Sequence, residues 1–260
     1  MAEESPVLTE LQGDIGVVTL NRPGKFNCVS RGLADSLSAA MRSLDANAQC
    51  RVVMLKANGK HFCTGADLDE VLAARETRAT LEAFITAGHD ALTALENSRL
   101  PIVAVVHGLC LAGGLELMMA CDVVVAAATA RFGDQHAQYG LIPGWGGTQR
   151  LPRLIGLRRA LHLMYSAEWL DAITAREWGL VSVVVEEAVL VEHAMTYART
   201  LAARNPQAIA AMKSLGRRGL DVPLAEGLAR ERECVVDALR SENVSEGLAA
   251  FQSRRVPKFS

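Results

Sequence analysis

The feature that most constrains the fold is an alternation of short valine- and isoleucine-rich runs with longer helical patterns. The runs cover residues 15–20, 51–57, 102–106 and 122–126, and glycine, asparagine or proline bounds them, as is typical of buried strands. Between them, apolar residues recur at helical spacing over residues 33–44 and 81–95. Strands separated by helices are typical of βαβ crossovers. The pattern therefore predicts an α/β fold with a parallel sheet and helices on its faces.

The last part of the chain differs, because arginine-rich helical patterns follow one another from about residue 143. Candidate helices cover residues 156–166, 174–178, 189–203, 206–219, 223–239 and 242–254, with one strand at 181–185. No low-complexity linker or internal repeat separates the two parts. We therefore expect this helical region to pack on the α/β core or on a neighbouring subunit.

Composition excludes several classes of protein. The 260 residues carry 27 basic and 29 acidic side chains, a net charge of −2, and only 5% of them are aromatic. No apolar run approaches the roughly 20 residues of a membrane span, and the acidic residues 1–5 are unlike a secretory signal. The sequence has no basic stripe with interleaved aromatic residues, the pattern that is typical of proteins that bind nucleic acid. Six scattered cysteines without a C-x-x-C pair favour a reducing compartment, and we expect each to be a small buried hydrophobe in a cytoplasmic protein.

Several common catalytic signatures are absent from the sequence. There is no G-x-x-x-x-G-K-[ST] loop, and the glycines at 108, 113 and 114 do not fit G-x-G-x-x-G. Neither H-E-x-x-H nor G-x-S-x-G occurs. P-loop, dinucleotide-binding, zinc-protease and serine-hydrolase interpretations therefore lose their main support, and we expect no metal.

Two glycine-containing segments directly follow predicted buried strands. In residues 59–68, Gly65 permits a turn that exposes the N–H group of Ala66. In residues 107–116, Gly113 and Gly114 lead into an apolar helix whose first N–H groups point outward. Two such donors from separate strand ends can converge into an oxyanion hole, the alternative being turns that only cap their strands.

Two titratable residues stand out near these turns. Glu116 lies in the apolar run 115–121, where a carboxylate either faces solvent or has a functional role in a site. His136 lies in the glycine-rich segment 131–151, and it is either exposed or able to exchange protons near neutral pH. In the same segment, we expect Thr148 to cap the helix that begins there.

Taken in order, these segments resemble the enoyl-CoA hydratase/isomerase, or crotonase, superfamily. The resemblance is carried by L-N-R-P at 20–23 with Asn27, F-C-T-G-A-D-L at 62–68, G-G-L-E at 113–116 with Cys121 and Asp122, Phe132 with Gly133, G-L-I-P-G-W-G-G-T-Q-R-L at 140–151, and the closing segment 251–259. It implies a crotonase-like spiral of ββα units over residues 1–200. It also implies a helical region at 201–260 for trimer formation, commonly within a hexamer that is a dimer of trimers.

The resemblance also implies an acyl-CoA thioester as the ligand, with coenzyme A as part of the substrate and no separate cofactor. The thioester carbonyl would accept hydrogen bonds from the N–H groups of Ala66 and Gly113, and Glu116 would be the general base toward water. Candidate substrate-binding residues are Arg22, Lys25, Gly65, Asp67, Leu68, Gly114 and Trp145, with Arg254, Arg255 and Lys258 as further candidates for the CoA phosphates. Trp145 either walls the acyl pocket or packs beneath its loop, and Asp122 is expected to be structural.

The chain departs from the family pattern at one position. Twenty residues after Glu116, where the hydratases carry a second glutamate, it has His136. A histidinium there could protonate the α-carbon, since an imidazole pKa near 6.5 leaves an acidic fraction at neutral pH; otherwise the ring points away and Glu116 acts alone. We expect an enoyl-CoA hydratase that adds water to a trans-2-enoyl-CoA.

The alternatives are an acyl-CoA isomerase, a decarboxylase, a C–C hydrolase or a non-catalytic acyl-CoA binder. A hydrolase of β-diketones would need an acidic partner for the histidine further along the loop. Only Trp145 stands in that neighbourhood.

Overall fold

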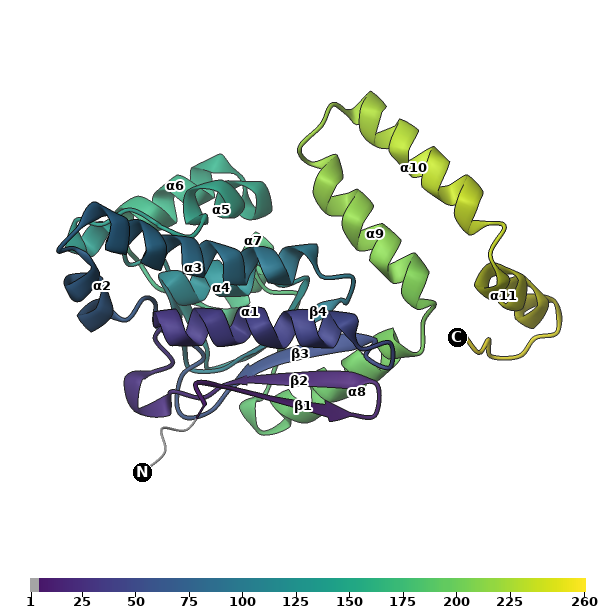
Figure 1. Ribbon diagram of the computed structural model, residues 1–260, viewed down its shortest axis with the longest axis horizontal. Helices are drawn as coiled ribbons and strands as arrows, with labels where there is room; N and C mark the ends of the chain where they lie inside the picture. The colour runs from purple at the N-terminus through teal and green to yellow at the C-terminus, as the bar shows by residue number, and fades with distance from the viewer. Residues whose placement is uncertain (1–4) are drawn as a thin grey trace.

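Two sheets organise the protein, whose computed structural model describes residues 5–260 (Figure 1). The acidic start at residues 1–4 lies outside this part. The main sheet has the order β1-β2-β3-β4-β6-β9, and the second has the order β5-β7-β8. Their strands are β1 (Val7–Gln12), β2 (Ile15–Leu20), β3 (Val52–Ala57), β4 (Ile102–Val106), β5 (Leu109–Leu111), β6 (Val123–Ala127), β7 (Arg131–Gly133), β8 (Leu170–Asp171) and β9 (Val183–Val185).

The strands from β2 to β9 in the main sheet run parallel, and all residues of β2 and β4 are buried. Burial of both faces explains why these strands are continuous apolar runs in the sequence. The five predicted strands are confirmed. Strand β1 was not predicted, since it is an edge strand that pairs antiparallel with β2 and exposes most of its side chains.

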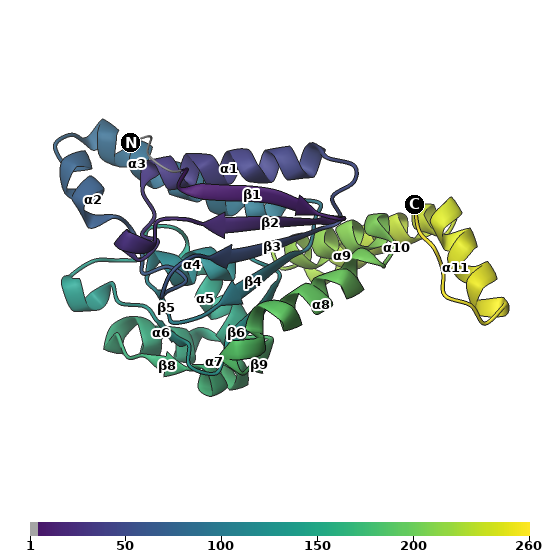
Figure 2. The same cartoon turned by 90° about the horizontal axis from the view of Figure 1, so that it is seen from below.

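Helices cover the sheet and connect its strands. Helices α1 (Arg31–Ala46) and α3 (Arg78–Asn97) pack against each other on one side, while α8 (Leu190–Ala202) packs on β2, β3, β4 and β6 from the other (Figures 1 and 2). The other helices are α2 (Leu68–Ala74), α4 (Gly113–Met119), α5 (Gly147–Ile155), α6 (Leu157–Ser166), α7 (Ala172–Trp178), α9 (Pro206–Gly219), α10 (Leu224–Ala238) and α11 (Glu242–Gln252).

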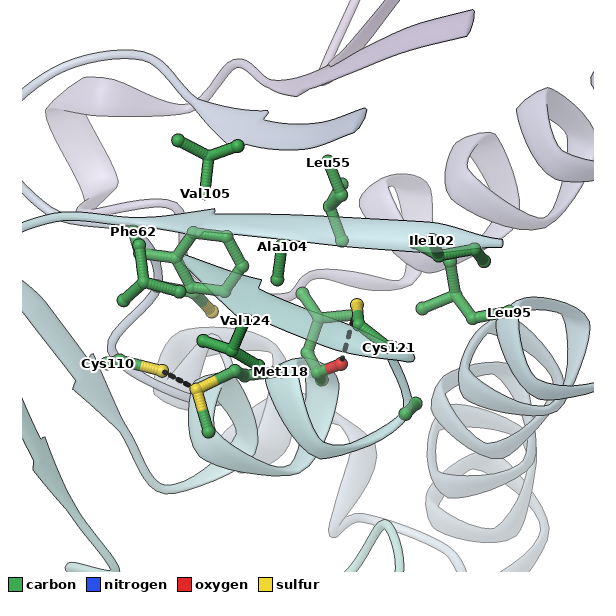
Figure 3. Packing of buried hydrophobic residues seen from close by; sticks show 14 of the residues in the cluster. Leu55, Phe62, Leu95, Ile102, Ala104, Val105, Cys110, Met118, Cys121 and Val124 are labelled. Carbon is green, nitrogen blue, oxygen red and sulfur yellow. Dashed lines mark hydrogen bonds between the residues drawn. The ribbon is translucent and has the colours of Figure 1, made fainter. Parts of the chain in front are cut away.

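The core continues beneath α4, where side chains from β3, β4, β6 and α4 meet (Figure 3). There the sulfur of Cys110 lies 3.9 Å from that of Met118. The prediction that all six cysteines are buried is right for four of them. Cys28 and Cys234 are partly exposed, because Cys28 lines a surface cavity and Cys234 lies on α10, a helix without buried residues.

Helices α9 to α11 form an arm that extends away from the sheets (Figure 2). No residue of α9 or α10 is buried. Two cations of α9 tie the arm to the core: Lys213 donates to the carbonyls of Leu95 and Leu100 (both 2.9 Å), and Arg217 pairs with Asp122 (2.8 Å). Asp122 also accepts a hydrogen bond from the amide of Ile102 (2.8 Å), which agrees with its predicted structural role.

Within residues 5–260, every helix is too short or too polar to cross a lipid bilayer.

Candidate active site

A cavity of about 600 Å³ contains most of the residues predicted for the site. Those that line it are Lys25, Gly65, Ala66, Asp67, Leu68, Gly113, Glu116, His136 and Trp145. Arg22 and Gly114 do not line it, since Arg22 lies behind Asp67 and Gly114 lies against Cys63. The fold thus brings together three segments that are far apart in the sequence.

The two glycine turns meet in this cavity. Gly65 has φ +118°, and a Cβ there would lie 3.2 Å from the Cβ of Ala112 and 3.5 Å from the amide nitrogen of Gly113. A Cβ at Gly113 would in turn lie 3.4 Å from the amide nitrogen of Ala66. Within the described residues, neither of these two amides donates a hydrogen bond to the protein. The amides of Ala66 and Gly113 are therefore neighbouring donors, and one carbonyl oxygen in the cavity can accept hydrogen bonds from both.

Buried polar side chains hold the first turn. Asp67 caps α2 by accepting from the amide of Asp69 (3.2 Å), and its other oxygen pairs with Arg22 (2.8 Å). Arg22 also donates to the carbonyl of Cys28 (2.6 Å). The side chain of Asn27 accepts from the Arg22 amide (2.8 Å) and donates to the carbonyl of His61 (2.8 Å). The L-N-R-P motif thus supports the turn that presents Ala66.

The second turn needs glycine for close packing. A Cβ at Gly114 would lie 2.1 Å from the carbonyl oxygen of Cys63, so a side chain there would push α4 away from the first turn. Ala112, just before α4, has φ 49° and ψ −120°, a conformation that alanine rarely adopts. Strain of this kind persists where the surrounding structure enforces it, which is common at functional sites.

Glu116 is buried in α4, with its side chain 1% exposed, so the interpretation as a solvent-facing residue is wrong. Its Oε1 accepts hydrogen bonds from the amides of Trp145 (2.8 Å) and Gly147 (2.7 Å). Its Oε2 has no hydrogen-bond partner in the described chain. One oxygen therefore anchors the carboxylate, and the other is available to a ligand.

This anchoring corrects the prediction for Thr148. Helix α5 begins at Gly147, and no side chain of its own segment caps it. The carboxylate of Glu116 supplies the cap from another element, because it accepts from the first helical amide. A Cβ at Gly147 would lie 2.8 Å from the Cβ of Pro143 and 3.2 Å from Oε1 of Glu116, which explains the glycine at this position.

The pKa of Glu116 is raised above its ordinary value because the carboxyl group is buried. The hydrogen bond from the Gly147 amide, the positive charge of a protonated His136 and the Trp145 amide oppose this effect. A carboxylate with a raised pKa is a stronger base toward water than an exposed one.

His136 faces Glu116 across the cavity, and its ring is 12% exposed, so it is not an exposed loop residue. Its Nε2 lies 3.9 Å from Oε2 of Glu116, which is too long for a direct hydrogen bond. On the other side of the ring, Nδ1 lies 2.8 Å from Oδ1 of the buried Asp134. The two unpartnered atoms, Nε2 and Oε2, can both contact one small group in the cavity.

Asp134 was not among the predicted site residues. An acidic partner of His136 was expected further along the loop, where only Trp145 stands, whereas the partner lies two residues earlier. Asp134 Oδ1 also accepts from the backbone amide of His136 (3.2 Å), an Asx turn. The D-x-H spacing is the signal that could have identified this pair, since aspartate commonly bonds to the backbone two residues ahead.

Burial by itself would lower the pKa of His136. The hydrogen bond to Asp134 and the charges of Asp134 and Glu116 raise the pKa by more than burial lowers it, so the pKa lies above its ordinary value. Asp134 and Glu116 are the charged groups that act on the ring. A histidine between two carboxylates favours the imidazolium form.

A charged network supports the loop from behind. Arg150 donates to the carbonyl of Trp145 (2.5 Å) and forms two hydrogen bonds with Glu96 (2.5 and 2.7 Å). Glu96 also pairs with Arg217 of α9 (3.2 Å). Arg150 thereby helps to fix the loop segment whose amides hold Glu116, and through Glu96 it links this segment to the arm.

Trp145 both walls the cavity and packs beneath its loop, so the two predicted roles coincide. Its indole fills the space where glycine leaves room in two helices. A Cβ added at Gly88 would lie 2.2 Å from the indole, and one added at Gly113 would lie 2.6 Å from it. Phe84 completes this wall, with ring centroids 5.8 Å apart.

Gly88→Ala should destabilise the protein, although alanine is ordinarily the better helix residue. The added methyl group must displace a buried indole, and overpacking of this kind costs about 1–3 kcal/mol. Urea unfolding at equal protein concentration measures the change in the free energy of unfolding. Gly32→Ala, in the exposed first turn of α1, is the matched control and should change stability little. If Gly88→Ala stabilises the protein, the indole does not fill this space.

The family model for enoyl-CoA hydratase/isomerase matches residues 10–260. The chain therefore belongs to the enoyl-CoA hydratase/isomerase family, and its two sheets and helical C-terminal region form the α/β crotonase fold.

Named relatives cover nearly the whole chain. It is 36% identical to a probable enoyl-CoA hydratase of Rhizobium meliloti, over 97% of each chain. It is 34% identical to the human mitochondrial methylglutaconyl-CoA hydratase, over 97% of this chain and 75% of the relative. A crystal structure of an enoyl-CoA hydratase from Bacillus anthracis matches with a TM-score of 0.93 at 32% identity, over 98% of each chain.

Proposed function

We propose that this protein adds water to the double bond of a trans-2-enoyl-CoA thioester. One observation carries the proposal: the unpartnered Oε2 of Glu116 faces Nε2 of His136 at 3.9 Å, in the same cavity as the free amides of Ala66 and Gly113. A base, an acid and two carbonyl-binding donors are the groups that hydration needs. The names of the relatives point in the same direction.

In this proposal, the thioester carbonyl accepts hydrogen bonds from the amides of Ala66 and Gly113. Glu116 Oε2 takes a proton from water as its oxygen bonds to the β-carbon. The two amides stabilise the negative charge that develops on the carbonyl oxygen. His136 then donates a proton to the α-carbon, which completes the 3-hydroxyacyl thioester.

The lining of the cavity favours an apolar acyl group. Phe84, Ile85, Leu141, Ile142 and Trp145 contribute apolar side chains to this lining. Among the lining residues, Lys25 is the one lysine, and there is no arginine. Its ammonium group already pairs with Asp69 (2.8 Å). A second carboxylate on the substrate, as in methylglutaconyl-CoA, would find as cations in this lining only Lys25, which pairs with Asp69, and His136, which the reaction needs as its proton donor.

For the CoA phosphates, we propose Lys25, because its ion pair with Asp69 is exposed to solvent and therefore weak enough to exchange for a phosphate. Arg22 is engaged with Asp67, so it contributes by holding the turn. Arg254, Arg255 and Lys258 belong to the arm end, and we propose that they serve the site of a neighbouring subunit.

The test is a spectrophotometric assay that follows loss of the conjugated thioester absorbance. The panel contains crotonyl-CoA, longer straight-chain trans-2-enoyl-CoAs and 3-methylglutaconyl-CoA. We expect turnover of the unbranched substrates and little of the dicarboxylic one. Tight binding of every thioester without turnover would instead identify a non-catalytic acyl-CoA binder.

A second candidate is hydrolysis of a carbon–carbon bond in a β-diketone, which the acidic partner of His136 favours. In that reaction a neutral His136 would activate water. The two carboxylates around the ring favour the protonated form, so we rank hydration first. Cleavage of a β-diketone without hydration of any enoyl-CoA would reverse this order.

We also propose that residues 201–260 form a homotrimer, alone or within a hexamer. The arm exposes large apolar side chains along its length: Leu220, Leu224, Leu228, Leu239, Leu248 and Phe251 are each 53–83% exposed. An apolar surface of this kind marks an interface. Light scattering after size exclusion should give a trimeric or hexameric mass, and Leu224→Asp with Phe251→Asp should give monomers. Leu8→Asp on β1 is the control, and a monomeric unmodified protein would contradict the proposal.

A further inference from the structure

Asp134 contacts His136 in a way that fixes the orientation of the ring. Its side chain is 1% exposed, and one oxygen accepts from both Nδ1 (2.8 Å) and the backbone amide (3.2 Å) of His136. An ionised carboxylate is only an acceptor, so Nδ1 must carry a proton. This leaves Nε2 directed toward Glu116, 3.9 Å away.

The second carboxylate oxygen of Asp134 is not needed for the hydrogen bonds to His136. This oxygen, Oδ2, is buried without a hydrogen-bond partner in the described chain. A buried carboxylate with one free oxygen is costly unless a positive charge lies beside it. A protonated His136 is the positive charge that the geometry offers. The charged groups that face the ring are Asp134 from its own loop and Glu116 from α4.

We propose that Asp134 is a positioning residue that holds His136 as an imidazolium with its Nε2–H directed into the cavity, so that this pair replaces the second glutamate of the hydratases. The inference rests on the proposed function and adds a residue to it. It explains how histidine can donate a proton at neutral pH, where an isolated imidazole is mostly neutral.

The protons balance over one turnover. An O–H bond of water breaks and its proton goes to Oε2 of Glu116, while the oxygen bonds to the β-carbon and the π electrons form an enolate. The Nε2–H bond of His136 then breaks as a C–H bond forms at the α-carbon. Glu116 is now protonated and His136 neutral, so one proton passing from Oε2 to Nε2, directly or through a water, restores the starting state.

The first test is independent of activity. With isotope-labelled histidine, NMR follows the titration of the His136 ring, assigned by its loss in His136→Gln. We expect the unmodified protein to titrate above an ordinary histidine, and Asp134→Asn to titrate at lower pH. If Asp134→Asn leaves the titration unchanged, the inference is overturned. If that variant does not fold, a titration of the unmodified protein at or below that of an ordinary histidine overturns it.

The second test is kinetic. Asp134→Asn should lower kcat by about tenfold or more, up to the ~10²–10⁴-fold that a general acid contributes, with little change in KM. Because His136 must be protonated, activity falls as pH rises through its pKa, and this alkaline limb should move to lower pH in Asp134→Asn. Asp90→Asn, which removes an exposed charge from α3, is the control and should match the unmodified enzyme. An unmoved alkaline limb would contradict the inference.

A double mutant separates action through the imidazole from a structural role. His136→Glu restores the carboxylic acid of the family pattern, and Asp134 then faces a like charge. In that background, Asp134→Asn should cost no activity, whereas a structural role would cost the same in both backgrounds. If no enoyl-CoA is hydrated by the unmodified protein, the proposed function fails, while the NMR titration still decides the role of Asp134.

Discussion

Glu116→Gln should lower kcat for hydration by about 10²–10⁴-fold, the contribution of a positioned general base. The glutamine carbonyl can still accept from the amides of Trp145 and Gly147, so the cap of α5 is retained while the base is lost. We therefore expect an unchanged thermal midpoint and an unchanged Kd for a saturated acyl-CoA. Steady-state kinetics on the best enoyl-CoA substrate, with isothermal titration for binding, measure both.

Glu116→Ala is the informative comparison, because it also removes the acceptor for two buried amides. It should lose activity and in addition stability, since leaving a buried donor unpaired costs about 1–3 kcal/mol. In the unmodified enzyme, activity should fall as pH decreases through the pKa of Glu116, and burial places this acidic limb above the range of an exposed carboxyl. Full activity in Glu116→Gln would eliminate the proposed base.

Removing the N–H group of Ala66 should lower kcat by about 10²–10³-fold, as the loss of one oxyanion-hole donor does. Replacing Ala66 by lactic acid converts its amide into an ester and adds no side-chain atom. The expected loss lies in kcat, because the donor stabilises charge that develops on the carbonyl oxygen during the reaction. The measurement is kinetics of the semisynthetic or suppressor-encoded protein.

The control is the same replacement at Ala79, an exposed residue in the first turn of α3. First-turn amides have no partner within their own helix, so its loss should be nearly neutral. If the Ala66 and Ala79 esters have equal activity, the amide of Ala66 does not bind the thioester carbonyl. Gly113 would then be the next amide to test.

The central parallel strands β2, β3, β4 and β6 were predictable because they are almost wholly buried and therefore mostly apolar. The same reasoning fails for β1, which lies at the edge and exposes most of its residues. The glycine turns were also predictable, because the glycine before Ala66 has φ +118° and the glycines at the start of α4 leave room for close packing. Local chemistry is sufficient where the constraint on a residue is local.

Contacts between distant segments were not predictable in this way. Thr148 is a good cap by its type, yet Glu116 caps α5 across 31 residues of sequence. Glycine is a poor helix former, yet position 88 requires it, because the indole of Trp145 occupies the space that a side chain would take. In both cases a neighbour in space overrides the preference of the residue in its own segment.

Residue types and their spacing were enough to predict the layered α/β fold, the two turns that expose amides, and Glu116 and His136 at hydratase spacing. Packing between distant segments was needed to show that Glu116 is buried with one free oxygen, that Asp134 is the partner of His136, and that Nε2 of the ring faces Oε2 of the carboxylate. The physical reason is that residue type fixes which protons a group can exchange. Burial and neighbouring charges, which depend on packing, decide which form the group adopts and what it faces.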